Sequence, residues 1–333
     1  MAERCVLLLT RRDDGEATEA SALLRRIGVP VHRLDADGLA DVRAVHGPDG
    51  VLTLDGHRFA PTVTWLRHYS LRAAPDGPPD GPAGGRMVYR DAWTALARQL
   101  ADVSPAAIGA ADPGQLVQRA RARALGVRVP RGLVTTDPAD AAGLLPAERY
   151  VLKVLDRHYV EPEPGRLDWY LPRVLDGDRL AGLPGVPRGT PVMLQEYVEH
   201  DAEYRVYLAG DELHAFEVVK EHPEDIWIRP DEVVVRQVRP PAAVASATRA
   251  IARETGAAFG AFDFLRARDG GEPVFLEMNA HGDWHWFERR AGVDVVTRAV
   301  VRTVRDLHRA AAGHARPAAV SLLAFLGAGR VHG

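Results

Sequence analysis

The chain has 333 residues, which is enough for two or three domains with substantial cores. Its 42 basic and 45 acidic residues give a formal net charge of −3, so the composition does not indicate binding to nucleic acid or to a membrane surface. Its apolar runs fall well short of the roughly 18 residues that span a membrane, and the N-terminal run is too short for a signal peptide. Cys5 is the only cysteine, which excludes a disulfide within the chain and fits the cytoplasm.

The first hundred residues predict a small α/β domain with a parallel sheet. A buried strand over 4–10, a helix over 17–27 and a strand over 29–34 follow one another, an order typical of parallel strands joined by a helix. Segment 73–86 is rich in proline and glycine and is predicted to be a loop. We expect Ser104-Pro105 to end the domain. Three further strands and a helix are predicted at 50–54, 57–60, 62–66 and 88–101.

The rest of the chain mixes helices with strands and shows no internal repeat. Segment 156–168 is predicted to be loop-like because it contains prolines and a glycine. The tail after Gly313 carries a short apolar piece, 320–327, which we expect to dock on the body or on a partner chain. Periodicity predicts helices at 114–125, 137–144, 241–256 and 293–311, and strands at 132–135, 150–155, 192–197, 204–209 and 213–219.

Two apolar runs, 259–265 and 274–278, flank the turn signal Asp269-Gly270-Gly271 and predict a β-hairpin. A three-residue loop places Asp263 directly opposite Glu277, with Asn279 on the same face, and opposed Cβ atoms lie roughly 5 Å apart. Such oxygen ligands suit Mg²⁺. Acidic strand residues often simply face water, but here both acids stand among large apolar residues. An even-numbered loop would put the two acids on opposite faces.

Lysine is rare in this chain. Only two of the 42 basic residues are lysines, Lys153 and Lys220, and the other 40 are arginines. In a chain that otherwise uses arginine, a lysine can mark a site that needs a compact ammonium group, although two lysines could also be chance survivors.

The order of these features resembles the ATP-grasp superfamily, in which two α+β subdomains close on ATP. Lys153 on an apolar strand is followed by Gln195-Glu196-Tyr197-Val198, then by Glu203 and Arg205, and finally by the hairpin acids. The resemblance covers residues 110–310. It implies an α/β pre-grasp domain with a parallel sheet at 1–105, a central subdomain at 106–190, a C-terminal subdomain with the metal site at 191–312, and a tail at 313–333.

The resemblance also implies a role for each matching residue. Lys153 is similar to the lysine that contacts the nucleotide phosphates, and Arg205 to the arginine that steadies phosphate or an acyl phosphate. Gln195 and the hinge that follows it resemble the segment that holds adenine. Taken singly, each residue could be an ordinary strand or surface residue. The remaining candidates are Glu203 for the ribose, Lys220 for the nucleotide, and Asp263, Glu277 and Asn279 for Mg²⁺.

Two features depart from the superfamily pattern. Many members carry an early lysine where this chain has Asp112-Pro113-Gly114-Gln115, and the segment after Lys153 lacks their Gly-rich loop. His158 is a candidate to contribute there, although a lone loop histidine is usually solvated.

The end of the hairpin resembles a narrower family, the graspetide synthetases, which are microviridin-type ATP-grasp maturases of ribosomal peptides. Residues 277–288 resemble their E-x-N-P-x-G-x-W-x-W-L-E run, and residues 64–67 resemble their W-x-R segment. The chain departs from the family at Ser104 for asparagine, Ala280 for proline and Asp283 for glutamine. The candidates for contact with an acceptor peptide are Arg67, His281, Asp283 and Trp284, although tryptophans there also fit core packing.

We therefore expect a cytoplasmic, homodimeric, ADP-forming ligase that uses ATP and Mg²⁺ and binds the leader and core of a precursor peptide. It would phosphorylate Asp or Glu side chains and join them to Ser or Thr hydroxyls or Lys amines, as ω-esters or ω-amides. Two alternatives stay open: a ligase that adds an amino acid to a small molecule or a protein tail, and an inactive grasp domain that only binds peptide. The peptide, the ring connectivity and the choice of ester or amide are left open as well.

Overall fold

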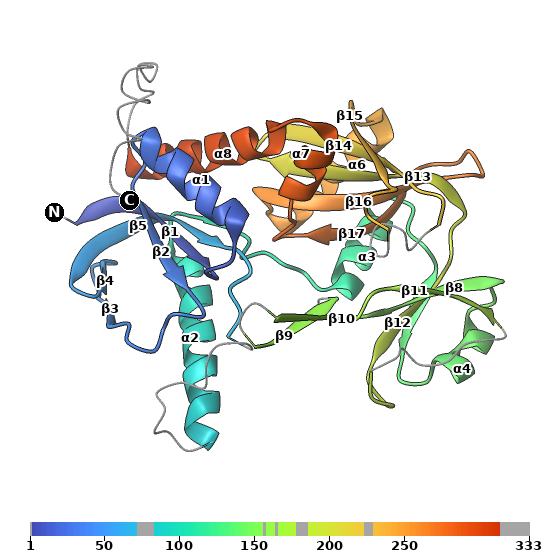
Figure 1. Cartoon of the computed structure of the whole chain (residues 1–333), viewed down its shortest axis with the longest axis horizontal. Helices are drawn as coiled ribbons and strands as arrows, with labels where there is room; N and C mark the ends of the chain where they lie inside the picture. The colour runs from blue at the N-terminus through green and yellow to red at the C-terminus, as the bar shows by residue number, and fades with distance from the viewer. Residues whose placement is uncertain are drawn as a thin grey trace.

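The computed structural model describes residues 2–71, 83–155, 158–163, 166–177, 186–222 and 229–313, and it arranges them in three main sheets and a two-stranded ribbon (Figure 1). The predicted loop at 73–86 lies outside the described residues up to 82, and its last residues belong to a helix. The apolar piece at 320–327 also lies outside them. No described helix is long and apolar enough to cross a membrane.

The first sheet has a parallel centre, as predicted. β1 (Glu3–Thr10) pairs in parallel with β2 (Val31–Asp35) and β5 (His57–Leu66), and β6 (Ala106–Ile108) continues the sheet beside β5. The predicted strands at 57–60 and 62–66 are thus one strand. An antiparallel edge is formed by β3 (Ala44–His46) and β4 (Leu52–Leu54). The sheet carries α1 (Gly15–Arg26) and α2 (Ala83–Val103), and the long apolar run of β1 is buried accordingly.

The central sheet is antiparallel and has a core of its own. Its strand order is β11 (Arg173–Asp176), β8 (Arg149–Val154), β12 (Val192–Glu196) and β7 (Gly132–Thr135). Tyr150, Leu152 and Leu194 are buried in this core. The helical pieces at one end are α4 (Pro138–Ala141) and a 3₁₀ turn (Ala142–Leu144).

The loop predicted at 156–168 is wrong, because this segment contains a hairpin ribbon. β9 (Tyr159–Glu163) pairs antiparallel with β10 (Arg166–Trp169). The ladder shifts register between Arg166 and Asp168, opposite the stretch that contains Pro162. Proline is tolerated there because a two-stranded ribbon consists only of edge strands.

The third sheet is also antiparallel and is buried on both faces. Its order is β15 (Val234–Val238), β14 (Glu212–Val219), β13 (His200–Ala209), β16 (Phe259–Ala267) and β17 (Val274–Asn279). Because successive side chains alternate, Val206 and Leu208 of β13 face one core and Tyr207 and Ala209 face another. The first core packs against α6 (Ala242–Thr255) and lies beside α3 (Gln115–Ala124).

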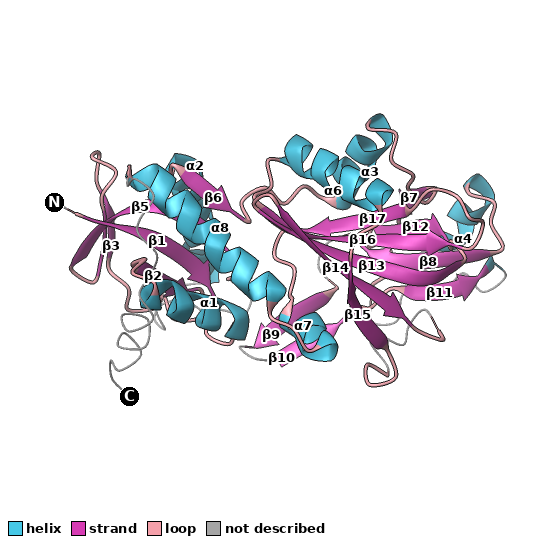
Figure 2. Cartoon of the chain, turned by 90° about the horizontal axis from the view of Figure 1, so that it is seen from above, coloured by secondary structure: helices cyan, strands magenta, loops and turns pink. Residues whose placement is uncertain are grey.

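The helix α8 (Val295–Ala312) joins the first sheet to the third. It contacts β1, β5 and α1 on one side and β13 and β14 on the other, and Figure 2 shows it running between the two sheets. A single apolar core includes Val6 and Trp65 from the first sheet and Tyr207 and Phe216 from the third. The short helix α7 (His285–Ala291) follows the end of β17 and lies next to this junction.

Candidate functional site

β16 and β17 bring the two predicted metal-ligand carboxylates together. Asp263 lies directly opposite Glu277 in the ladder, as the sequence predicts. The predicted three-residue loop is wrong, because β16 ends at Ala267 and β17 begins at Val274, which leaves residues 268–273 between them. The ladder shifts by one residue between Asp263 and Phe264, and Leu276 is the extra residue of this β-bulge. The bulge restores the pairing that an even-numbered loop alone would have destroyed.

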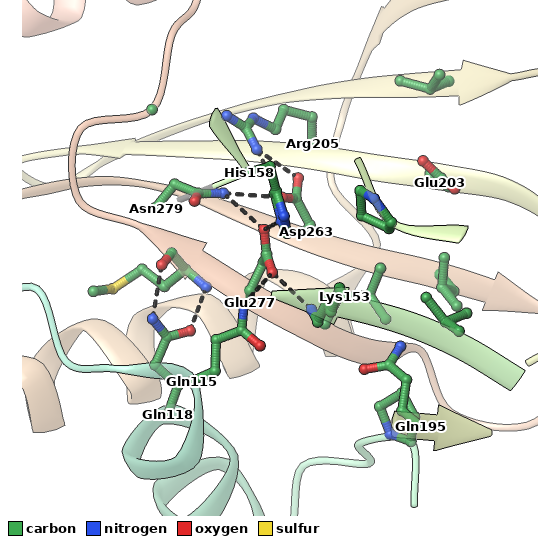
Figure 3. A pocket seen from close by; sticks show the side chains of 18 of the residues that line it. Gln115, Gln118, Lys153, His158, Gln195, Glu203, Arg205, Asp263, Glu277 and Asn279 are labelled. Carbon is green, nitrogen blue, oxygen red and sulfur yellow. Dashed lines mark hydrogen bonds and ion pairs between the residues drawn. The ribbon is translucent and has the colours of Figure 1, made fainter. Parts of the chain in front are cut away.

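Each of these carboxylates is paired with a lysine or an arginine (Figure 3), and Oε1 of Glu277 also lies 3.9 Å from Nε2 of His158. The Nζ atom of Lys153, on β8, lies 2.9 Å from Oε2 of Glu277. Arg205, on β13, donates from Nη1 to both oxygens of Asp263, at 2.9 and 2.7 Å. The amide of Asn279 donates to Asp263 at 3.2 Å and to Glu277 at 3.4 Å. We call Lys153, Arg205, Asp263, Glu277 and Asn279 the hairpin site.

The two acids of the hairpin site ionise differently. Burial alone would raise the pKa of Glu277, but Lys153 and His158 hold it well below its usual range. Burial raises the pKa of Asp263 to about 6, against the opposing charge of Arg205, and the negative charge of Glu277 adds to the rise. A further cation would therefore help to ionise Asp263. Carboxylate and amide oxygens are the ligands that Mg²⁺ prefers, so the donor set fits this ion.

This mixed set differs from a typical cluster of metal-binding side chains. Among the described residues, no group of three or more His, Cys, Asp or Glu side chains could hold a metal ion. The hairpin site supplies two carboxylates and one amide, and a cation there would need further oxygen ligands, such as water or phosphate.

The helix α3 holds the strand that carries Glu277. Gln118 accepts a hydrogen bond from the backbone N–H of Met278 at 2.7 Å and donates to its carbonyl at 2.8 Å. Gln115, from the segment 112–115 where the sequence lacks the expected early lysine, donates to Oε2 of Glu277 at 3.5 Å. Both glutamines were absent from the predicted site. The available signal was the helical period, which puts Gln118 on the buried face of α3.

The predicted adenine segment lies at the end of β12. The backbone N–H groups of Glu196 and Tyr197 donate to the carbonyls of Arg131 and Arg149, at 3.0 and 2.9 Å. They therefore hold the sheet together, which makes Val198 the better candidate for a backbone bond to a base. The side chain of Gln195 accepts a bond from the buried Arg119 at 3.3 Å, and burial lowers the pKa of Arg119 to about 10.

Glu203, on β13, forms a third ion pair with Lys220, which directly follows β14. Oε1 of Glu203 lies 2.8 Å from Nζ of Lys220 and 3.2 Å from Nε2 of His200. Burial alone would raise the pKa of Glu203, but these two partners hold it below its usual value. Both lysines of the chain thus face a half-buried carboxylate.

One cavity of about 600 Å³ connects these features. Its walls come from the central sheet, the third sheet, α3 and the segment after β17. All the residues predicted to bind nucleotide or metal line it: Lys153, Gln195, Glu196, Tyr197, Val198, Glu203, Arg205, Lys220, Asp263, Glu277 and Asn279.

Arg67 is a buried support and does not line the cavity. Its side chain is only 1% exposed, and Nε lies 3.0 Å from Asp14. Its Nη2 atom pairs with Glu16 and, at 2.5 Å, with Oδ1 of Asp283. The same oxygen of Asp283, Oδ1, also lies 2.9 Å from Nε2 of His68. We call Asp14, Glu16, Arg67, His68 and Asp283 the Arg67 cluster.

The Arg67 cluster fixes the segment after β17 to the first sheet. Arg67 donates to the carbonyls of residues 281 and 282 at 3.0 and 3.3 Å. Glu16 accepts bonds from the backbone N–H groups of Trp284 and His285 at 2.7 and 2.6 Å, at the start of α7. Trp284 is fully buried, and its indole N–H donates to Thr297 at 2.9 Å. Arg67 and Trp284 are buried and do not line the cavity, so the structure does not place them where the predicted contact with an acceptor would need them.

His281, Gly282 and Asp283 do line the cavity, as does His68. Nδ1 of His281 donates to the carbonyl of Leu66 at 3.0 Å, since a carbonyl can only accept. Gly282 has no room for a side chain, because an added Cβ would lie 2.3 Å from Cβ of Ala261 and 3.1 Å from Nη2 of Arg205. Asp14 and Glu16 were missed by the sequence. Their position just after a central parallel strand is the signal that could have found them.

Solved structures share this architecture. The macrocyclase MdnC from Microcystis aeruginosa, bound with the precursor peptide MdnA, is 17% identical with a TM-score of 0.72, covering 91% of this chain and 99% of that one. The ATP-grasp ligase PsnB, complexed with a minimal precursor, Mg and ADP, is 20% identical with a TM-score of 0.70, covering 91% and 97%. A Chryseobacterium gregarium RiPP-associated ATP-grasp ligase, in complex with ADP and a leader and core peptide, is 17% identical with a TM-score of 0.70, also covering 91% and 97%.

Comparison of the sequence with protein-family models found no match, and comparison with curated proteins found none either. The structural likeness spans nearly the whole of each neighbour, and it establishes that this chain has the ATP-grasp fold. The predicted fold class is confirmed.

Proposed function

We propose that this protein is an ADP-forming ligase that activates Asp or Glu side chains of a ribosomal precursor peptide and joins them to Ser or Thr hydroxyls or Lys amines. The observation that carries the proposal is the hairpin site, where two half-buried carboxylates, an amide and two cations converge on one cavity. Structures of the same fold are described as a macrocyclase and as peptide-bound ligases, which supports a peptide substrate.

In this proposal the cavity holds ATP between the central and third sheets. Val198 and its neighbours receive adenine, Glu203 binds the ribose, and Lys220 stands near the phosphates. Asp263, Glu277 and Asn279 hold Mg²⁺, which neutralises charge on the nucleotide phosphates when bound.

Lys153 and Arg205 supply the rest of the electrostatic work. Each is nearly buried and now neutralises one carboxylate, with side-chain exposures of 6% and 15%. Fixed cations in a site shielded from water stabilise charge that develops during phosphoryl transfer, at no cost of reorganisation. We assign Lys153 to the transferred phosphate and Arg205 to the acyl phosphate.

We further propose the domain division that the family resemblance implies. The expected boundaries are 105, 190 and 312. The first two each move by one strand, because β6 pairs with β5 in the first sheet and β12 pairs with β7 and β8 in the central sheet. A cytoplasmic homodimer that binds neither nucleic acid nor membrane completes the proposal.

A two-part assay tests the function. Full-length protein is incubated with ATP, Mg²⁺ and the short peptide encoded beside its gene, and ADP release is followed together with peptide mass. We expect ADP formation that depends on the peptide, with one water lost per bond. Hydroxylamine should trap the activated carboxylate as a hydroxamate. Wild-type protein that releases no ADP with any such peptide would instead point to an inactive grasp domain.

A further inference from the structure

We propose that Asp283 makes the acceptor end of the cavity selective for a protonated amine, so that a peptide Lys side chain is the nucleophile and the product is an ω-amide. This inference rests on the proposed function and specifies its acceptor.

Asp283 lies beside the residue assigned to the acyl phosphate. The guanidinium of Arg205, which holds Asp263, also donates from Nε to the hydroxyl of Tyr207 at 3.3 Å. That hydroxyl in turn donates to the backbone carbonyl of Asp283. Gly282 lies next to Arg205, because a Cβ added to Gly282 would lie 3.1 Å from Nη2 of Arg205. An acceptor held at Asp283 would therefore be close to the activated carboxyl group.

The charge around Asp283 is unbalanced. In the Arg67 cluster a single guanidinium serves three carboxylates, those of Asp14, Glu16 and Asp283. Burial raises the pKa of Glu16 to about 7, so this acid is partly protonated near neutral pH. Burial and Arg67 lower the pKa of His68, which therefore adds no positive charge. Arg205 also acts on Asp283, but its guanidinium is already paired with both oxygens of Asp263. Asp14 and Asp283 therefore exceed the charge of Arg67, so this end of the cavity favours a cation.

The Asp283 carboxylate is held on one side and open on the other. Arg67 and His68 both contact the same oxygen, Oδ1, while the side chain as a whole is 66% exposed. Both contacting groups are themselves buried, with side-chain exposures of 1% and 10%. Oδ2 is thus presented by a rigid support, and an ammonium group can approach it from the cavity.

The chemistry balances without another reactant. The ammonium group held at the Asp283 carboxylate first gives one proton to water. The amine nitrogen then attacks the acyl carbon. A C–N bond forms, the C–O bond to phosphate breaks, and phosphate leaves as HPO₄²⁻ with the second proton from nitrogen. A hydroxyl acceptor carries no charge, so it can donate only a neutral hydrogen bond to Asp283 and lacks the ionic attraction that an ammonium group has.

The test compares two acceptors on one peptide. The neighbouring-gene peptide is made with either Lys or Thr at the acceptor position, and ring formation is followed by mass. Hydroxamate formation is measured without any acceptor, because it reports carboxylate activation alone. We expect the wild type to use Lys at least about tenfold better than Thr in kcat/KM, the effect of one charge-assisted hydrogen bond. Asp283→Asn and Asp283→Gln should lower Lys use about tenfold and leave Thr use and the hydroxamate unchanged.

A matched control is Asp269→Asn, which removes an exposed carboxylate at the far end of the hairpin and should change neither reaction. Equal use of Lys and Thr by the wild type, or an equal loss with both in the Asp283 variants, would overturn the inference. Preferential coupling of added free lysine would overturn its assignment to the peptide. A wild type that yields no hydroxamate would overturn the proposed function itself, which keeps the two failures distinct.

Discussion

The hairpin site and the Arg67 cluster both bury acidic side chains, but they balance charge in different ways. In the hairpin site each carboxylate has its own cation, and all four charged groups face the cavity. In the Arg67 cluster one arginine, almost fully buried, serves three carboxylates that come from two distant segments. An ion pair that faces a cavity can open, and its charged groups can then bind a ligand. An arginine buried among several carboxylates instead holds distant segments of the chain together. We therefore expect substitutions in the hairpin site to affect activity and substitutions in the Arg67 cluster to affect stability, and four experiments test this expectation.

The largest effect is expected for stability in Arg67→Ala. This change leaves Asp14 and Glu16 buried without their shared cation, and breaking a buried ion pair costs about 3–5 kcal/mol. Urea denaturation measures the loss. Arg128→Ala is the control, because Arg128 pairs with Asp269 at the surface, and it should show no measurable change. A similar result for both variants would remove the distinction between hub and surface pair.

Lys153→Ala should instead cause a large loss of activity. Removal of a fixed charge at the transferring phosphate is expected to lower ADP formation about 10²–10³-fold. Peptide-dependent ADP release measures this, with circular dichroism to show that the variant is folded. Arg128→Ala again serves as the control and should retain wild-type turnover. If Lys153→Ala turns over at the wild-type rate, the assignment of this lysine to the phosphates is wrong.

The Arg67 cluster should also give stability a pH dependence. Burial raises the pKa of Glu16 from 4.5 to about 7, so the folded state binds more protons than the unfolded state between these values. Stability from this group is therefore fully present below pH 4.5 and is lost as the pH rises through 7, by at most about 3 kcal/mol. Denaturation of the wild type and of Glu16→Gln across this range checks it. The variant should have the flatter profile, and parallel profiles would contradict the prediction.

The smallest effect is expected for Gln118→Ala. This glutamine satisfies both the N–H and the carbonyl of Met278, and leaving buried polar groups without partners costs about 1–3 kcal/mol. Because Met278 lies between Glu277 and Asn279, the Mg²⁺ concentration needed for half-maximal ADP release should rise as well. Gln115→Ala, which loses only a 3.5 Å contact, should do less to stability. A change in stability without a change in Mg²⁺ dependence would limit Gln118 to a packing role.

Local patterns predicted the hairpin site well, although one step of the argument was wrong. The apolar runs and the Asp-Gly-Gly signal located the hairpin, and Asp263 does face Glu277. The loop length was wrong, and the bulge at Leu276 compensated for it. A bulge depends on how a strand packs on its neighbours, so strand alternation alone does not reveal it. Here β17 packs on α3, where Gln118 bonds both the N–H and the carbonyl of Met278.

The Arg67 cluster was harder to predict because it depends on three segments far apart in sequence. Arg67 and Asp283 were recognised, but their partners Asp14 and Glu16 lie more than fifty residues before Arg67. Only the fold brings the end of β1, the end of β5 and the segment after β17 together. The ribbon β9–β10 was missed for the opposite reason: its prolines and glycine are loop signals, and pairing overrode them.

The helix α8 has a consequence for how the molecule unfolds. Since one core includes residues of the first sheet, the third sheet and α8, these parts should lose their amide protection against hydrogen exchange together. The central sheet has a smaller core of its own, built around Tyr150, Leu152 and Leu194. It is therefore the unit that can open at low cost while the Arg67 cluster stays intact. Release of the nucleotide that we propose to bind in this cavity would then require opening of the central sheet only.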